Sequence, residues 1–188
     1  MATTFTRMDE STAEQWAEIG RQTFEHRDRV ADRVLEMLRS LEEITDGFAV
    51  DQLQHSLQTA TRAERAGADA EVVVASLCHD IGKAVSVPNH PEIAAAILKP
   101  YVRPEVHDMI RVHQDFQGRH YYAHFGGDPN AREKHRANFE REVFDLAEKF
   151  ADEWDQTSFD PDYPTQPLEH FEPLVREVFA RAKMPIGS

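Results

Sequence analysis

The sequence contains a single cysteine, Cys78, and no apolar run that approaches 18 residues. One cysteine excludes a framework of internal disulfide bonds and is typical of reducing compartments. The lack of a long apolar run argues against a membrane-spanning helix. The first residues, MATTFTRMDEST, have neither the basic nor the apolar segment of a secretory signal. We therefore expect a soluble, cytoplasmic protein.

Basic residues are also scarce. The 188 residues include 21 Lys and Arg against 34 Asp and Glu, which gives a formal net charge of −13 at pH 7 with histidine neutral. Such a chain is repelled by phosphate backbones and by anionic membrane surfaces, so we expect neither nucleic acid nor a membrane as a partner. Eight Gly and ten Pro are too few for a low-complexity protein, and 40% hydrophobic residues are enough to build a core.

Histidine, in contrast, is abundant. The chain has ten histidines, and eight of them lie between His55 and His135. Histidine is the commonest metal ligand in proteins and a frequent general base at neutral pH. The clustering therefore indicates a candidate metal or catalytic site in the middle of the chain.

Apolar residues recur at helical spacing along most of the chain, and no alternating run typical of a strand is clear, so we predict an all-α fold. A capping box of Ser11 and Glu14 opens the N-terminal region, which forms one long helix or two with a break near Gly20. Pro91 opens a short helix that Pro100 closes. The other predicted helices span residues 50–66, 69–80, 104–116, 132–155 and 168–182, and residues 117–131 form an irregular stretch.

Metal-type ligands are spaced so that five helices can bring them to one place. His79 and Asp80 are adjacent at the end of a buried apolar helix, and Gly82 permits the unwinding that lets both side chains reach one site. Ligands that converge from several helices are typical of dinuclear sites in helical bundles. The six candidate ligands are His55, His79, Asp80, His90, His113 and Asp155.

Two of these assignments have a competing interpretation. His90 precedes Pro91 at a predicted helix start, where a histidine can serve only as a cap. Without His90 the second metal has few protein ligands, and a mononuclear phosphohydrolase becomes the better interpretation. Asp152 competes with Asp155 for the last ligand position.

With these residues in place, the chain resembles the HD-domain superfamily. Within it, the chain is most similar to the mixed-valent diiron oxygenases, the branch that includes myo-inositol oxygenase and a phosphonate-cleaving enzyme. The resemblance covers about residues 44–180. It rests on QLQHSLQTATRAERAGADAEVVVASLCHDIGK at 52–83, GGDP at 126–129, WDQ at 154–156 and PLEHFEPLV at 167–175. It implies an HD-domain helical bundle over residues 44–188 that encloses a dinuclear metal site, with residues 1–43 as an N-terminal helical extension.

The resemblance also implies the roles of the candidate ligands. One iron would be bound by His55, His79 and Asp155, and the other by His90 and His113, with Asp80 as the bridge. The cofactor would be a mixed-valent Fe(II)/Fe(III) pair, with O2 as co-substrate. The expected reaction cleaves a C–C or C–P bond of a small hydroxylated substrate.

Lys83 matches a lysine that contacts substrate in this branch, so it is a candidate catalytic and substrate-binding residue beside Asp80. The alternative role for Lys83 is a charge at a helix C-terminus that complements the helix dipole.

The sequence departs from the phosphonate-cleaving pattern at cationic positions. Gln117, Gly118 and Asp152 stand where that enzyme has a lysine, an arginine and a further arginine, and Thr45 and Phe48 replace its tyrosine–glutamate lid. Fewer cations predict a less anionic substrate. The remaining candidate substrate-binding residues, besides Lys83 and Gln117, are Arg119 and His120, with Tyr121 and Tyr122 as further possibilities.

Two other classes of function stay open. A metal-dependent HD phosphohydrolase acting on a nucleotide or phosphoester would use the same ligands, and O2 uptake without phosphate release separates the two. A non-enzymatic metal-binding or regulatory module is the third class, against which the intact ligand set argues. We expect a small-molecule substrate and a monomer or homodimer.

Overall fold

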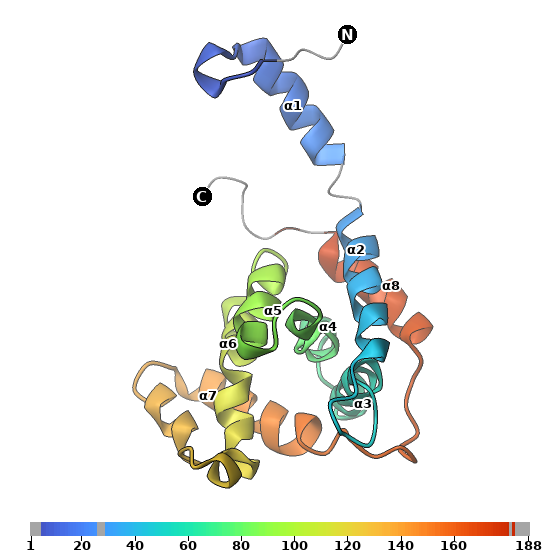
Figure 1. Cartoon of the computed structure of the whole chain (residues 1–188), viewed down its shortest axis with the longest axis vertical. Helices are drawn as coiled ribbons and strands as arrows, with labels where there is room; N and C mark the ends of the chain where they lie inside the picture. Colours follow the sequence, from blue (N-terminus) through green and yellow to red (C-terminus); the bar gives the residue numbers. More distant parts are fainter. Residues whose placement is uncertain (1–4, 26–28, 181, 183–188) are drawn as a thin grey trace.

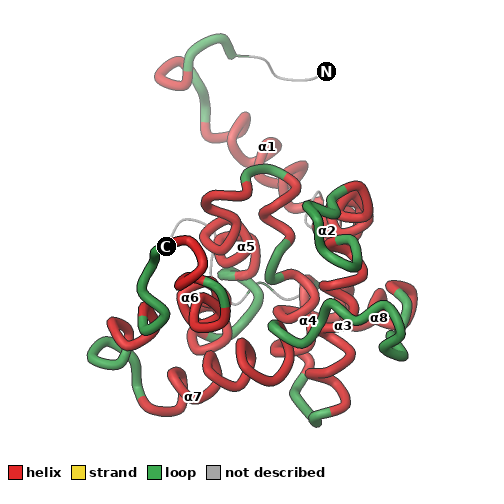
Figure 2. Tube along the Cα trace, turned by 60° about the horizontal axis from the view of Figure 1, so that its bottom comes forward, coloured by secondary structure: helices red, strands yellow, loops and turns green. Residues whose placement is uncertain are grey.

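The computed structural model describes residues 5–25, 29–180 and 182, and over these residues it contains helices and loops but no strand (Figures 1 and 2). The predicted all-α fold is thus confirmed. The α-helices are α1 (Ala13–Glu25), α2 (Val30–Ser40), α3 (Gln52–Arg65), α4 (Ala70–Cys78), α5 (His90–Leu98), α6 (Pro104–Gln117), α7 (Arg141–Lys149) and α8 (Leu168–Phe179).

Helix α4 forms the centre of the bundle. Asp69 caps its N-terminus by accepting from the backbone N–H groups of Glu71 and Val72, and every residue from Val72 to Cys78 is buried. An apolar helix without a polar face must be covered on all sides. Helices α3, α6 and α8 pack against it, and α5 and α7 pack in turn against α6 (Figure 1).

The N-terminal region divides into two helices with different surroundings. The apolar face of α2, with Val34, Leu35 and Leu38, is buried in the same core as the later helices. Helix α1 extends away from the bundle (Figure 1). The boundary between residues 43 and 44 stays a prediction.

Three sequence predictions for helix starts and breaks were wrong. Thr12 and Gln15, rather than Ser11 and Glu14, form the reciprocal capping box, at 2.8 and 3.3 Å. Helix α1 runs through Gly20 to Glu25, because one glycine in an exposed helix costs only about 1 kcal/mol. The helix predicted from residue 132 begins at Arg141, after a 3₁₀ turn at Ala131–His135.

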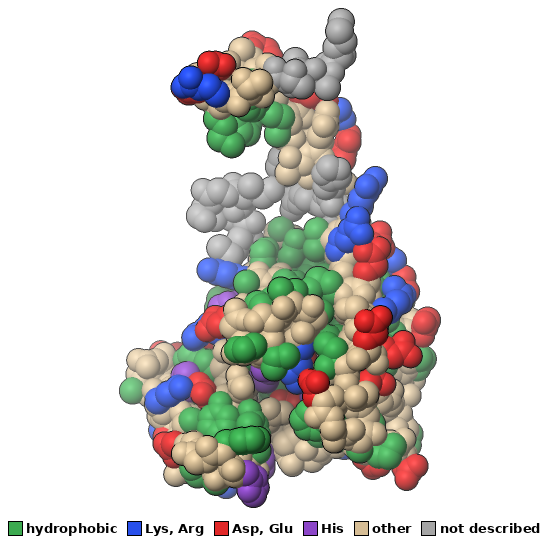
Figure 3. Space-filling model, in the orientation of Figure 1, with side chains coloured by type: hydrophobic (Ala, Val, Ile, Leu, Met, Phe, Trp, Pro, Cys, Tyr) green, Lys and Arg blue, Asp and Glu red, His purple; other side chains and the backbone are tan. Residues whose placement is uncertain are grey.

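The other helix boundaries differ less from the predicted ones. The helix predicted over 69–80 ends at Cys78, and the one predicted over 168–182 ends at Phe179. His26 lies outside the described residues. None of the helices in the described ranges has the length and apolar character needed to cross a membrane. Acidic side chains with interspersed basic ones gather along the edge formed by α2 (Figure 3).

Candidate metal centre

Six buried His and Asp side chains converge inside the bundle from five segments. His55 comes from α3, His79 and Asp80 from the end of α4, His90 from the first residue of α5, His113 from α6, and Asp155 from the π-helical turn Phe150–Asp155 that follows α7. All six are at most 5% exposed. The structure therefore brings together the complete set of ligands that the sequence predicted.

The end of α4 explains how two adjacent residues can share one site. Successive residues of a regular helix point about 100° apart. Helix α4 ends at Cys78, His79 still has helical angles, and Asp80 leaves them, with φ −101° and ψ 5°, before the 3₁₀ turn Ile81–Ala84. The change of direction at Asp80 turns its carboxylate to the same side as the His79 ring.

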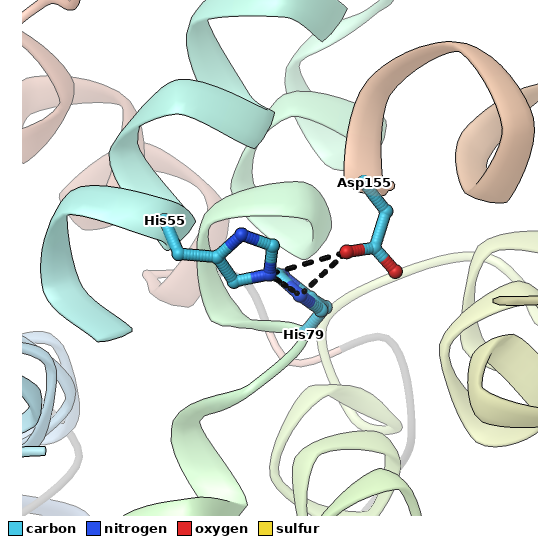
Figure 4. Close-up of side chains that lie close together, drawn as sticks. All are labelled: His55, His79 and Asp155. Carbon is cyan, nitrogen blue, oxygen red and sulfur yellow. Dashed lines mark hydrogen bonds and ion pairs between the residues drawn. The ribbon is translucent and has the colours of Figure 1, made fainter. Parts of the chain in front are cut away.

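The first group consists of His55, His79 and Asp155 (Figure 4). The Nε2 atoms of His55 and His79 are 3.0 Å apart, and Asp155 Oδ1 lies 3.1 Å from the first and 3.5 Å from the second. The other carboxylate oxygen, Asp155 Oδ2, is buried and has no hydrogen-bond partner in the described part of the chain. A buried carboxylate oxygen in that condition is available to a cation.

The second group consists of His90, His113 and Asp80. Asp80 Oδ1 lies 3.0 Å from His90 Nε2 and 3.6 Å from His113 Nε2, and these two nitrogens are 3.2 Å apart. Asp80 Oδ2 faces the first group instead, 3.5 Å from His55 Nε2 and 3.3 Å from His79 Nε2. Asp80 thus lies between the two groups, with one oxygen directed to each.

Backbone carbonyls orient all four imidazole rings. Nδ1 of His55 donates to the carbonyl of Ser158 at 2.9 Å. The Nδ1 atoms of His79, His90 and His113 each donate to the carbonyl three residues earlier, at 2.7 to 2.8 Å. Because a carbonyl only accepts, the proton of each neutral ring is held at Nδ1 and the lone pair of Nε2 faces the centre. Metal-bound histidines are oriented in the same way.

This arrangement fits metal ions. Two neutral rings whose Nε2 lone pairs face each other at 3.0 or 3.2 Å repel unless a proton or a cation lies beside them. Four imidazoles and two carboxylates, without a thiolate, suit iron and other borderline transition metals. The metal assignment of the six residues stays a prediction that this donor set supports.

The short distances between these side chains also shift their pKa values. Burial disfavours a charge on His79, but the carboxylates of Asp80 and Asp155 outweigh it and raise the pKa of His79 to about 10. Burial alone would raise the pKa of Asp155, but the charge on His79 and hydrogen bonds from His55 and His79 hold it well below its usual range. His113 differs, because burial lowers its pKa. In the metal-free protein, the proton on His79 therefore supplies part of the positive charge that a bound metal ion would provide.

Metal binding at neutral pH should consequently release protons. With a pKa of about 10, His79 is protonated at pH 7 and must lose that proton before Nε2 can bind a metal. Metal affinity should therefore rise with pH up to about pH 10. Calorimetric titration in two buffers of different ionisation enthalpy measures the release directly. Equal apparent binding enthalpies in both buffers would contradict it.

The predicted substrate-binding residues fall into two sets. Lys83 Nζ donates to Asp80 Oδ2 at 2.6 Å, and Gln117 Nε2 donates to Asp155 Oδ1 at 3.0 Å, so both contact candidate ligands. Arg119 and His120 lie instead beside Asp152, at 3.8 and 2.9 Å. Their role in substrate binding stays a prediction.

The positions of Asp152 and His90 bear on the two ligand assignments that had a competing interpretation. Asp152 pairs with His120 and with the buried Arg132, at 3.0 Å, while Asp155 lies against His55 and His79. His90 directs Nε2 toward Asp80 and His113 and uses Nδ1 for the carbonyl of Val87, so its ring takes part in the centre.

Sequence reasoning missed two neighbours of the centre. The ring of Phe159 stacks on His55 with centroids 4.2 Å apart, and Phe48 stacks on the outer side of Phe159 at 4.7 Å. Gln52 is fully buried and contacts Lys83. Its position three residues before His55, on the same face of α3, was a signal that could have identified it.

Comparison with known proteins places the chain in a family. Residues 53–170, more than half of the chain, match the HD domain. A search of curated proteins gives no match. HD domains are generally metal-dependent enzymes, and the buried His and Asp groups are compatible with a metal site. The chain, with its all-α bundle and the His79-Asp80 pair at its centre, belongs to the HD-domain family.

Proposed function

We propose that this protein is a diiron oxygenase that uses O2 to cleave a C–C or C–P bond of a small hydroxylated substrate. The observation that carries the proposal is the position of Asp80, which directs one carboxylate oxygen to His55 and His79 and the other to His90 and His113. A carboxylate between two sets of imidazoles is suited to bridge two metal ions.

The roles of the residues follow from their contacts. His55, His79 and Asp155 would hold one iron, and His90 and His113 the other, with Asp80 shared. When bound, the iron pair would supply Lewis acidity toward the substrate hydroxyl and electrons for the reduction of O2. The chain itself excludes water, since His55, His79 and Asp155 are fully buried. Lys83 and Gln117 position the two carboxylates through their hydrogen bonds.

The charges around the centre support a substrate of low negative charge. Asp152 is paired with Arg119, His120 and Arg132, and Arg132 also pairs with Glu148 at 3.1 Å. Cations already engaged with carboxylates are poorly placed to bind a phosphate or phosphonate dianion. A small molecule also suits the net charge of −13 better than a nucleic acid or a membrane. We propose that the protein is a monomer or a homodimer.

Iron content and redox behaviour test the proposal. Protein produced with added iron should contain about two irons per chain and show a mixed-valent signal by electron paramagnetic resonance after partial oxidation. Hydroxylated small molecules should then be screened for O2 uptake without phosphate release. One metal per chain, or two that stay redox-silent, together with phosphate release from phosphoesters, would replace the oxygenase with an HD phosphohydrolase.

A further inference from the structure

The Gln52 side chain is buried beside the candidate metal centre, and only the oxygen of its amide group has a hydrogen-bond partner in the described part of the chain. The residue is fully buried in the first turn of α3, and Oε1 accepts a hydrogen bond from Lys83 Nζ at 2.9 Å. An ammonium group only donates, so the atom that Lys83 contacts must be the amide oxygen, and Nε2 is fixed on the other side. Nε2 is buried and has no hydrogen-bond partner over the described ranges of the chain.

A second glutamine on the same helix shows the ordinary arrangement. Gln58 is also fully buried, but its Nε2 donates to the carbonyl of Asp160 at 2.7 Å and its Oε1 accepts from the Asp160 N–H at 3.3 Å. Buried amides in proteins are normally satisfied in this way, because an unpaired donor away from water costs free energy. The unused donors of Gln52 therefore point to a missing acceptor.

Lys83 adds a further donor to the same place. Of its three N–H groups, one is used by Gln52 Oε1 and one by Asp80 Oδ2, which leaves one. The two N–H groups of Gln52 Nε2 bring the total of free donors to three. Gln52 Oε1 keeps one lone pair beyond its bond with Lys83, so the free donors of the pair outnumber its free acceptor by three to one. The Lys83 side chain is 15% exposed, so the pair borders solvent.

We infer that the Gln52–Lys83 pair binds a carboxylate of the substrate, which makes the substrate a small hydroxy acid. A site whose free donors outnumber its free acceptor favours a group that carries acceptors alone over a hydroxyl, which also brings a proton that must be accepted. Carboxylates and phosphates both meet that condition. Asp80 already offsets the charge of Lys83, and over the described residues no arginine is hydrogen-bonded to or ion-paired with Gln52 or Lys83, so the monoanion is favoured over a phosphate dianion. The identity of the substrate rests on the proposed oxygenase function, but the carboxylate site does not.

The test uses the full chain and three small probes: glycolate, the simplest hydroxy acid; glycerol, a neutral polyol; and inorganic phosphate. The ¹H–¹⁵N signal of the Gln52 side-chain amide is identified as the signal lost in Gln52→Glu. In metal-free protein, glycolate should shift this signal, while glycerol should leave it in place and phosphate should bind more weakly. This measurement needs neither metal nor turnover.

Calorimetry on variants completes the test, with metal-free and iron-loaded protein. Gln52→Glu keeps an oxygen for Lys83 but removes the amide donors, so glycolate affinity should fall by at least about tenfold. Gln54→Glu makes the same change on the same helix at a partly exposed position, and affinity should stay within about twofold.

Three outcomes would overturn the inference: no shift of the Gln52 signal with glycolate, equal shifts with glycerol, or tighter binding of phosphate. If Gln52→Glu fails to fold, sequential assignment of the unmodified protein identifies the Gln52 side-chain signal, and its shift still decides. Iron content measured on the same preparations separates the two proposals. A chain that takes up two irons but gives no glycolate response refutes the carboxylate site alone, and a glycolate response in a chain that takes up no iron when supplied with it refutes the diiron centre alone.

Discussion

Replacement of Asp80 by alanine should abolish the binding of both metal ions. Asp80 is the one candidate ligand with an oxygen directed to each group, so its loss removes a ligand from both sites at once. It also leaves four imidazoles with only Asp155 to balance two cations, and it deprives Lys83 of its carboxylate partner. Loss of a residue that merely supports a ligand costs about 10–100-fold in metal affinity, so removal of a shared ligand should cost at least about 100-fold. Metal analysis after dialysis measures the outcome.

Asp152→Asn is the matched control for this experiment. Asp152 is a partly buried carboxylate three residues before Asp155, but its partners are His120, Arg119 and Arg132. This variant should keep both metals. Asp80→Asn, which preserves the shape of the side chain, distinguishes loss of a ligand from loss of the fold. Retention of two irons in Asp80→Ala would remove Asp80 from the centre.

His55 and His113 could be predicted from the sequence because each lies on a helix whose apolar residues already indicated burial, whereas the preference for Asp155 over Asp152 came from the resemblance to the HD-domain family. His113 lies on the same side of its helix as Met109 and Ile110, so the face that carries its imidazole follows from these neighbours. Leu53 and Leu57 beside His55 indicate only that its helix packs inward. The pairing of His79 with Asp80 needed only local knowledge that the helix ends there.

The orientation of the rings could be predicted only in part. Three of the Nδ1 partners lie three residues back along the chain, but the partner of His55 is the carbonyl of Ser158, 103 residues away. That contact depends on how the loop after Asp155 returns across α3. The half-used amide of Gln52 is hidden for a similar reason, because it depends on Lys83, 31 residues later in the chain.

The errors in the helices come from competing local interactions. Thr12 displaced Ser11 as the cap because Ser11 donates instead to the carbonyl of Met8 and accepts from the indole of Trp16. The charged segment from residue 132 has the composition of a helix. Arg132 is nevertheless buried against Asp152 and Glu148, and the chain forms a short 3₁₀ turn there before α7 begins.

Gly82→Ala should have the second large effect, through His90. A Cβ atom at position 82 would lie 2.3 Å from the carbonyl oxygen of His90 and 2.7 Å from its Cα. These are backbone atoms at the buried start of α5, so no side chain can rotate to make room. The first turn of α5 must shift, and His90 Nε2 must move away from Asp80 and His113. Added volume in a packed core costs about 1–3 kcal/mol and occasionally more.

The two metal positions should therefore respond differently to Gly82→Ala. The group of His55, His79 and Asp155 does not include α5 and should retain its ion, so the variant should hold about one iron per chain, with a lowered melting temperature. Gly20→Ala is the control, because a Cβ there meets nothing within 4 Å in α1 and the substitution should be neutral or slightly stabilising. Two irons and an unchanged melting temperature in Gly82→Ala would show that His90 is not held against Gly82. Loss of both irons together with a lowered melting temperature would show that the two positions bind metal only as a pair.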